Sequence, residues 1–457
     1  MTAFAAYFWR RQWRADLGVA LLAASVVLGA ANPAAATKIT RVVSPGGIVA
    51  WLVQEPSIPM LSVEISFQGG SVYDPPGKEG LANLLSGLLD EGAGDIDSIA
   101  FQTRLEDLAI SLSFTAGRET FSGSLRTLTK NRDEAFRLLG LALTQPRFDD
   151  EPVTRIRGQI LAGLLRAAQN ANRIASRTFF EAAYPGHPYG HPTRGTEETV
   201  TAITADDLRA FVATRLAKDT MLIGAVGDIT PDELSRLLDS ALGPLPATSV
   251  EFAIPEIAFP EENRTIIVRR GNPQSVLMFG MPGIKRDDPG YFAAILLNYV
   301  LGGGSFSSRL YSEIREKRGL AYSVYSSVYP LQQSGMIIGG VGTANDRVAE
   351  SLELVRAEIR DVALNGISED ELARAKTYIT GSFPLRLDSN ARIANMLVAL
   401  QIFDLGIDYL ERRADIVNSV TLEDVSAMAQ RLFKADGMLV VVVGDPVGVE
   451  GEEIAAE

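Results

Sequence analysis

The feature that most constrains the fold is a long-range internal repeat. Residues 203–228 read ITADDLRAFVATRLAKDTMLIGAVGD, and residues 420–445 read VTLEDVSAMAQRLFKADGMLVVVVGD. The two segments align residue by residue without a gap. In each, a threonine (Thr204 or Thr421) precedes acidic residues, which is typical of a helix N-cap. An amphipathic helix and an apolar strand ending in Val-Gly-Asp follow. The match of cap, helix, strand and turn predicts two halves built alike.

A second pair of segments supports this prediction. Leu108–Ser113 resembles Leu320–Tyr325, and residues 148–151 and 367–369 each precede a long helical pattern. We therefore expect an α+β fold of two homologous halves, each an antiparallel-type sheet packed with helices, of roughly 200 residues each.

The boundary between the halves is predicted from proline. The stretch 243–262 reads GPLPATSVEFAIPEIAFPEE, and each of its prolines removes a backbone donor and disfavours helix. This stretch is the predicted linker, between an N-terminal domain at 37–242 and a C-terminal domain at 263–457.

The composition excludes several classes of function. The chain has no cysteine, which excludes disulfides, thiolate catalysis, thiolate zinc sites and iron–sulfur clusters. It has only two histidines, His187 and His191, too few for a His-rich metal site. A net charge of -13 argues against binding nucleic acid through a basic surface.

Residues 1–36 are predicted to be an export signal. They have an arginine-rich start, an apolar stretch at 17–29 and three alanines before Thr37, where cleavage is expected. An uncleaved anchor is the alternative, although the apolar run is short for a membrane span. We expect a periplasmic protein with no membrane attachment after signal cleavage.

The segment 77–92 reads GKEGLANLLSGLLDEG and predicts a helix from about 79 to 91 with an apolar leucine face. It resembles the metal-binding helix of the M16 family (pitrilysin, insulinase, mitochondrial processing peptidase), whose pattern is G-L-A-H-x-x-E-H. The two family histidines fall on Asn83 and Gly87, and the family glutamate falls on Ser86. The resemblance extends from about Ile39 to Asp445 and implies tandem α+β halves.

The resemblance also shows what is missing. Zinc hydrolases use about three protein ligands and a carboxylate base, whereas glycine has no ligating group and an amide is a weak zinc ligand. The family's third ligand falls in residues 159–165, QILAGLL, which hold no acid. We therefore expect no metal in this chain. A different metal on Asn83, Asp90 and Glu91 is the alternative to a solvated helix face, which we favour.

The two histidines lie in the segment 184–192, YPGHPYGHP. A metal clip is one interpretation, but a proline follows each histidine and glycines mark turns, so helical i,i+4 geometry is barred. We favour a structural loop, and the resemblance places this segment in a connecting loop of the first half.

The segment 301–322 is the richest in candidate binding residues, and near its start are Gly302, Gly303 and Gly304. The glycines predict a flexible turn, Phe306, Leu310 and Ile314 predict a buried stripe, and Gly319 predicts a helix stop. The pattern does not match a phosphate loop. A plain turn is one interpretation. The resemblance implies another, substrate handling as in noncatalytic subunits of processing peptidases.

Arg318 and Tyr322 fit the R-G-L-x-Y pattern that, in M16 proteins, supplies an Arg and a Tyr to the cleavage site. A guanidinium can bind a peptide carbonyl or carboxylate, and a phenol can donate to a developing oxyanion. In the repeat these positions correspond to Glu106 and Ile110, so the fold itself does not require Arg and Tyr. The alternative is a surface ion pair for Arg318 and a core aromatic for Tyr322.

The resemblance and the missing ligands together predict a zinc-free subunit of a heterodimeric M16 metallopeptidase. A homologous zinc-bearing subunit is the expected partner, and a peptide is the expected substrate. The alternative is a noncatalytic peptide-binding or assembly protein of the same fold. A stand-alone hydrolase with a Ser–His or Cys–His pair has little material in this chain.

Overall fold

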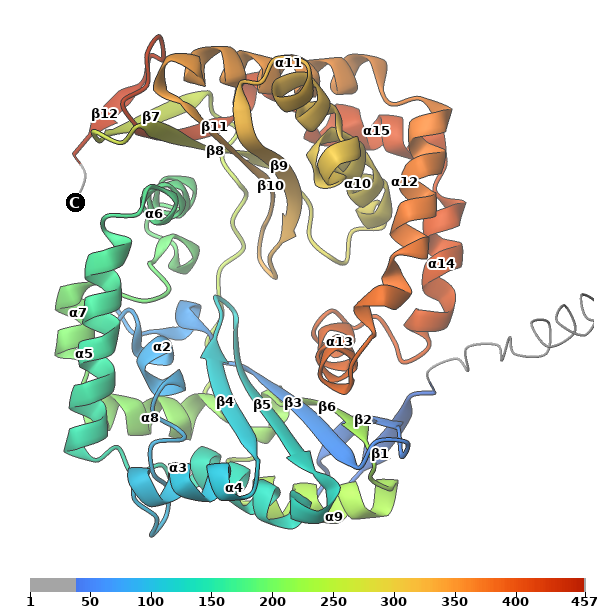
Figure 1. Ribbon diagram of the computed structural model, residues 1–457. Coiled ribbons are helices and arrows are strands. Elements are labelled where there is room, and N and C mark those ends of the chain that lie inside the picture. The colour runs from blue at the N-terminus through green and yellow to red at the C-terminus, as the bar shows by residue number, and fades with distance from the viewer. Residues whose placement is uncertain (1–37, 456–457) are drawn as a thin grey trace, which may run out of the picture. The chain divides into compact units, whose positions relative to one another are not determined.

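The computed structural model describes residues 38–455, so the export signal predicted at 1–36 lies outside the described residues. From Thr40 onward the chain forms two six-stranded sheets (Figure 1). The strands of the first sheet, in spatial order, are β1 (Thr40–Val43), β2 (Val49–Gln54), β6 (Leu222–Gly227), β3 (Met60–Gln68), β5 (Thr120–Leu128) and β4 (Ser111–Ala116). The strands of the second sheet are β12 (Glu452–Ile454), β7 (Arg264–Arg269), β11 (Leu439–Gly444), β8 (Gln274–Pro282), β10 (Gly335–Ala344) and β9 (Ala321–Pro330).

Helices pack with both sheets, which confirms the expected α+β fold. The helices of the first half are α2 (Leu81–Ser86), α3 (Ser98–Asp107), α4 (Arg132–Thr144), α5 (Asp150–Ala167), α6 (Ala171–Ala183), α7 (Glu197–Ala202), α8 (Ala205–Arg215) and α9 (Pro231–Leu242). Those of the second half are α10 (Tyr291–Asn298), α11 (Val348–Asn365), α12 (Glu369–Gly381), α13 (Asn390–Ile402), α14 (Tyr409–Ser419) and α15 (Leu422–Leu432). Across the described part of the chain, no helix combines the length and the apolar character needed to cross a membrane.

The sheets are mixed rather than purely antiparallel. The long central strands pair antiparallel, as β3 does with β5 and β8 does with β10. However, β2 runs parallel to β6, and β7 runs parallel to both β11 and β12. The two parallel pairs at equivalent places, β2–β6 and β7–β11, follow from the repeat, because in each half the last long strand returns to the centre of the sheet.

The internal repeat appears in the structure as predicted. Thr204 caps α8 by accepting the backbone N–H of Asp207, and Thr421 caps α15 by accepting that of Asp424. Each cap is a complete capping box, in which the acid also accepts from the threonine N–H. The strand after each helix, β6 or β11, occupies the third place in its sheet.

One helix of each half packs on the sheet of the other half. Helix α6 of the first half packs on β8 and β11, and α13 of the second half packs on β3 and β6 (Figure 1). The contacts are close. A Cβ at Gly280 of β8 would lie 2.3 Å from the Phe179 ring of α6, and a Cβ at Gly224 of β6 would lie 2.4 Å from the carbonyl oxygen of Ala394 in α13. Both helices have 13 residues.

A partly buried polar network joins the β9–β10 turn to the first half. The Glu119 carboxylate accepts the backbone N–H of Gln332 at 2.8 Å and the hydroxyl of Tyr189. The same hydroxyl accepts the backbone N–H of Gln333 at 3.0 Å.

Residues 243–263 have neither helix nor strand, although Leu245 and Phe259 are buried there. The domain boundaries and the 243–262 linker stay predictions.

Candidate functional site

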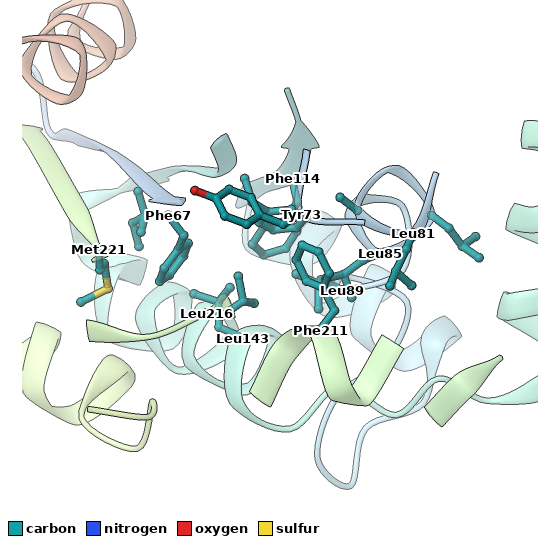
Figure 2. Close-up of a cluster of buried hydrophobic side chains, with 14 of the residues drawn as sticks. Phe67, Tyr73, Leu81, Leu85, Leu89, Phe114, Leu143, Phe211, Leu216 and Met221 are labelled. Carbon is teal, nitrogen blue, oxygen red and sulfur yellow. The ribbon is translucent and has the colours of Figure 1, made fainter. Parts of the chain in front are cut away.

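The helix that resembles a metal-binding helix is shorter than the sequence predicts. Helix α2 begins at Leu81 and ends at Ser86, whereas we expected a helix from about 79 to 91. The helix is shorter because Gly87 forms its C-cap. Its apolar face is as expected. Leu81, Leu85 and the following Leu89 point into a core that includes Phe114 and Phe211 (Figure 2). Packing against this core, rather than helix length, fixes the position of α2.

Asp74 holds the N-terminal end of α2. Its carboxylate accepts the backbone N–H of Gly80 at 2.8 Å and that of Ala82 at 2.9 Å, in place of a side chain at the N-cap, which is Gly80. The carboxyl is only 6% exposed. Burial raises the pKa of Asp74 to about 7, against the lowering effect of the two amides.

The residues at the three degenerate metal positions do not fit a zinc ion. Asn83 offers an amide, and the Ser86 hydroxyl already donates to the Asn83 carbonyl at 2.8 Å. A Cβ at Gly87 would lie 3.0 Å from the Ile156 side chain of α5. The nearest neighbour at Gly87 is thus a side chain. The described residues contain no group of three or more His, Cys, Asp or Glu placed to hold a metal.

The two acids after α2 have other partners. The Glu91 carboxylate pairs with Arg155 of α5 at 2.7 Å and accepts the hydroxyl of Ser98. The side-chain amide of Gln102 donates to the backbone carbonyl of Asp90 at 2.9 Å and to the Asp90 carboxylate at 3.3 Å. Asp90 and Glu91 are half-buried and paired within the chain, so the solvated helix face that we favoured is wrong for these two residues.

The glycine-rich segment is packed rather than loose. It follows α10 as a π-helical turn, Tyr299–Gly303, a type of irregularity that often marks functional sites. A Cβ at Gly302 would lie 2.4 Å from the Ser326 hydroxyl oxygen of β9, and Gly302 is buried. A Cβ at Gly304 would lie 2.7 Å from the Tyr299 carbonyl oxygen. Only Gly303 of the three is exposed, so it is the one that can meet a ligand freely.

Arg309 anchors the far end of this segment. Its guanidinium binds both carboxylate oxygens of Glu371 in α12, at 2.7 and 2.8 Å, and contacts Asp361 of α11 at 2.8 Å. Hydrogen bonding to Arg309 lowers the pKa of Glu371 to about 2. This two-pronged pair fixes the loop between two helices.

Phe306 lies outside the core, against expectation. Leu310 and Ile314 are fully buried as predicted, but Phe306 is 72% exposed. The spacing of four assumed one continuous α-helix, whereas Phe306 lies in a separate 3-10 turn, Ser305–Ser307, ahead of a π-helical segment, Tyr311–Glu316. Its ring meets Tyr311 edge-on at 4.9 Å between centroids.

Tyr322 projects into solvent at a β-bulge. In the β9–β10 ladder, Ser323 pairs with Gly342 and Ala321 pairs with Thr343, so Tyr322 is the extra residue. Its side chain is 79% exposed, which contradicts the alternative of a core aromatic. The Arg315 guanidinium lies 4.9 Å from its ring, and the Tyr322 hydroxyl has no hydrogen bond within residues 38–455.

Arg318 lies next to this tyrosine in a surface ion pair. Its guanidinium contacts the Glu313 carboxylate at 2.7 Å and the Glu313 carbonyl at 2.8 Å. The neighbouring Gly319 has a φ of 60° and ends the helical segment, as predicted. Within residues 38–455, neither Arg318 nor Tyr322 forms a hydrogen bond or ion pair with α2, and their role in binding a substrate stays a prediction.

Sequence reasoning missed two more tyrosines and an arginine. Tyr325 and Tyr329 lie on the exposed face of the edge strand β9, at 51% and 37% exposure. The sequence AYSVYSSVYP holds their signal, because alternation puts Val324 and Val328 inside and the tyrosines outside. Arg315 gave no such signal, since its role depends on the Tyr311 and Tyr322 rings on either side.

The two histidines form a structural loop, as favoured. The Nδ1 of His187 accepts the backbone N–H of Tyr189 at 3.1 Å, and its Nε2 faces the Pro255 carbonyl at 2.9 Å. These contacts fix the tautomer with the proton on Nε2. The carbonyl of His191 accepts from Arg118 at 3.3 Å.

Comparison with known proteins gives matches over both halves. Residues 49–197 match a family model described as insulinase (peptidase family M16), and residues 202–379 match one described as peptidase M16 inactive domain. The crystal structure of a peptidase M16 inactive domain from Pseudomonas fluorescens is 30% identical, with a TM-score of 0.84, over 91% of this chain and all of that one.

Two curated relatives carry contrasting names. A non-peptidase homolog, YmxG, of Helicobacter pylori is 26% identical over 81% of this chain and 85% of its own length. An uncharacterized zinc protease of Streptomyces coelicolor is 27% identical over 86% of each chain. This chain is therefore similar over most of its length both to a protein named as a zinc protease and to one named as a non-peptidase homolog.

Proposed function

Because this chain is an inactive member of the M16 peptidase family, without the zinc ligands, we propose that it is the noncatalytic subunit of a heterodimeric metallopeptidase. A homologous zinc-bearing subunit would supply the metal and the general base. This chain would contribute Arg318 and Tyr322, with Gly303 of the glycine-rich segment, to hold the peptide substrate.

The position of Tyr322 carries the proposal. A tyrosine that is 79% exposed, at a bulge and with its hydroxyl unbonded to the rest of the described chain, is free to donate a hydrogen bond to a substrate oxygen. Its counterpart in the repeat, Ile110, is 6% exposed and serves packing. Arg318 can exchange its Glu313 pair for a peptide carbonyl or carboxylate at little cost, because surface ion pairs contribute about 0–1 kcal/mol.

The test is turnover of a fluorogenic peptide by a complex of this chain with a zinc-bearing homologue that copurifies with it. Tyr322→Phe and Arg318→Ala should each lower kcat/KM by about tenfold to a thousandfold, as loss of an oxyanion donor does. Arg374→Ala, which removes an exposed ion pair with Asp370 on α12, is the matched control and should not change turnover. Unchanged turnover in both site variants would refute the assignment.

The alternative function is peptide binding or assembly without proteolysis. The exposed Tyr325 and Tyr329 on β9 and the exposed Phe306 favour it, since exposed aromatic side chains serve binding as well as catalysis. Copurification separates the two functions. A stoichiometric zinc-bearing homologue supports the peptidase subunit, and a complex of unrelated chains supports assembly.

The proposed location is the periplasm, supported by the signal-like pattern of residues 1–36, whose role in export stays a prediction. Cell fractionation tests it directly. A mature chain beginning at Thr37 in the periplasmic fraction is the expected result, and an intact signal retained in the membrane fraction would favour the uncleaved anchor.

A further inference from the structure

A pocket of about 360 Å³ lies between α5, α6 and the loop 191–197. Its volume is within the range of small-ligand sites, about 300–1,000 Å³. One wall is apolar, with Leu161 and Leu164 of α5 and Phe180 of α6. The same lining also holds four arginines, Arg118, Arg173, Arg177 and Arg194.

The charge of this pocket is opposite to that of the chain. Four arginines line it against one carboxylate, Glu197, while the whole chain carries -13. Arg177 has its own partner, Glu181, at 3.8 Å. An anion entering the pocket would still meet more positive than negative charge, in a recess where water screens less than at the open surface.

Arg118 is held in place before any ligand arrives. Its guanidinium lies over the Phe180 ring, 4.1 Å from the centroid. Its Nη1 donates to the carbonyls of Tyr189 and His191. A guanidinium with its position fixed by the protein loses little side-chain entropy when it binds an anion.

The pocket adjoins the degenerate metal helix. Leu161 and Leu164 belong to the stretch where the family places its third ligand, and Gly195 in the pocket wall packs against Glu79, just before α2. The Thr199 hydroxyl fixes that approach by donating to the Glu79 carbonyl at 2.7 Å.

We propose that this pocket binds a peptide carboxylate, with the arginines on the anion and the apolar carbons beside it against the leucines and Phe180. The choice of a peptide rests on the proposed function, whereas the preference for an anion rests on the pocket alone. The carboxylate has two possible sources, a free C-terminus or the side chain of Asp or Glu.

The experiment measures binding of labelled peptides to the purified full chain by fluorescence anisotropy. One peptide has a free C-terminus and an internal glutamate next to leucine, a second is amidated, and a third has Glu→Gln. Binding that weakens about tenfold or more on amidation assigns the C-terminus, and the same loss on Glu→Gln assigns the side chain. Equal binding of all three peptides would overturn the proposal.

Variants locate the binding. Arg118→Met should weaken the preferred peptide by about tenfold or more. Arg118 also supports the fold, so a second variant is needed. The double variant Arg173→Gln, Arg194→Gln changes two exposed arginines of the lining and should weaken peptide binding by the same factor. Arg166→Gln, on α5 but outside the pocket lining, is the matched control. Unchanged affinity in the double variant would overturn the pocket assignment. The assay needs no zinc-bearing partner, so its failure is distinguishable from failure of the peptidase-subunit proposal.

Discussion

The two sheet edges, β4 in the first half and β9 in the second, share one inward pattern and differ in what they present to solvent. Both bury alternate residues, such as Leu112 on β4 and Val324 on β9. The exposed face of β4 carries Ser111, Ser113 and Thr115, all small hydroxyls. The exposed face of β9 carries tyrosines. The fold specifies the inward residues. Of the outward tyrosines, Tyr329 packs edge-on against Phe180 of α6 at 6.1 Å between ring centroids, so the more exposed Tyr322 and Tyr325 are the ones available for binding.

The same contrast holds within α2. Its leucines are buried in the core of Figure 2, while its ligand positions hold an amide, a hydroxyl and a glycine. The helix thus has the buried leucines that packing needs and lacks side chains suited to zinc. The comparison therefore separates residues that maintain the fold from residues that carry function.

The largest stability effect should come from the packed face of α2. We expect Leu85→Ala to lower the free energy of unfolding by about 2–5 kcal/mol, because it removes a fully buried side chain and leaves a cavity. Ser86→Ala, on the former ligand face, should cost less than about 1 kcal/mol. Urea unfolding measures both. Similar losses for the two would mean that the ligand face is itself structural.

The Asp74 cap of α2 should make the stability of the protein depend on pH. Asp74 is buried, and its pKa of about 7 lies above the ordinary value of 3.8, so the folded state keeps a proton that the unfolded state has released between these values. The free energy of unfolding should therefore fall as pH rises from about 4 to about 7, by up to about 4 kcal/mol, and level off above pH 7.

Two variants isolate this contribution in urea titrations at several pH values. Asp74→Asn should flatten the decline. Asp288→Asn, which alters the carboxylate that accepts the Gly290 N–H at the start of α10, is the control and should keep the decline because Asp74 is intact. An unchanged slope in Asp74→Asn would assign the pH dependence to other groups.

A smaller effect should distinguish packed from open glycines in the second half. Gly302→Ala would place a Cβ 2.4 Å from the Ser326 hydroxyl oxygen and 2.7 Å from the Ser326 backbone nitrogen, and should cost about 1–3 kcal/mol. Gly381→Ala, where a Cβ meets nothing within 4 Å, should be neutral or stabilise by about 0.5–1 kcal/mol. Thermal unfolding of both proteins measures the difference, and a neutral Gly302→Ala would show that the segment yields easily.

The smallest stability effect should be at Tyr322. Removing this exposed ring in Tyr322→Ala sacrifices the contact with Arg315, worth about 0.5–1 kcal/mol. Its repeat counterpart provides the reference, because Ile110→Ala empties a buried position and should cost about 2–5 kcal/mol. Denaturant midpoints compare them. If Tyr322→Ala cost as much as Ile110→Ala, Tyr322 would be a structural residue.

The repeat made much of the fold predictable, because caps and strand alternation are local signals. Thr204 and Thr421 cap their helices as predicted, and the strands after them lie at equivalent places. The assignment of Asn83, Ser86 and Gly87 to the ligand positions of the family rests on the resemblance and stays a prediction. The predicted end of the α2 helix was wrong, because Gly87 caps the helix although the leucine periodicity continues beyond it.

The remaining features depend on tertiary contacts that no local pattern records. Phe306 is exposed because the chain leaves the α-helical period around it, and Tyr322 is exposed because the ladder gains one residue. The pocket arginines come from the β4–β5 turn, α6 and the loop after His191. Only the folded chain brings them together, so the sequence showed a net negative protein and concealed a local cationic recess.

The reciprocal placement of α6 and α13 bears on how such a chain can be divided. If either half were made alone, the face of its sheet that the other half's helix covers would be exposed to solvent. Its own helix, α6 or α13, would also lose the sheet on which it packs, so each half covers apolar surface of the other. We expect fragments cut near residue 250 to aggregate when made singly and to recover solubility when produced together. Duplication of an ancestral unit followed by such an exchange would have made separation of the two copies costly from then on.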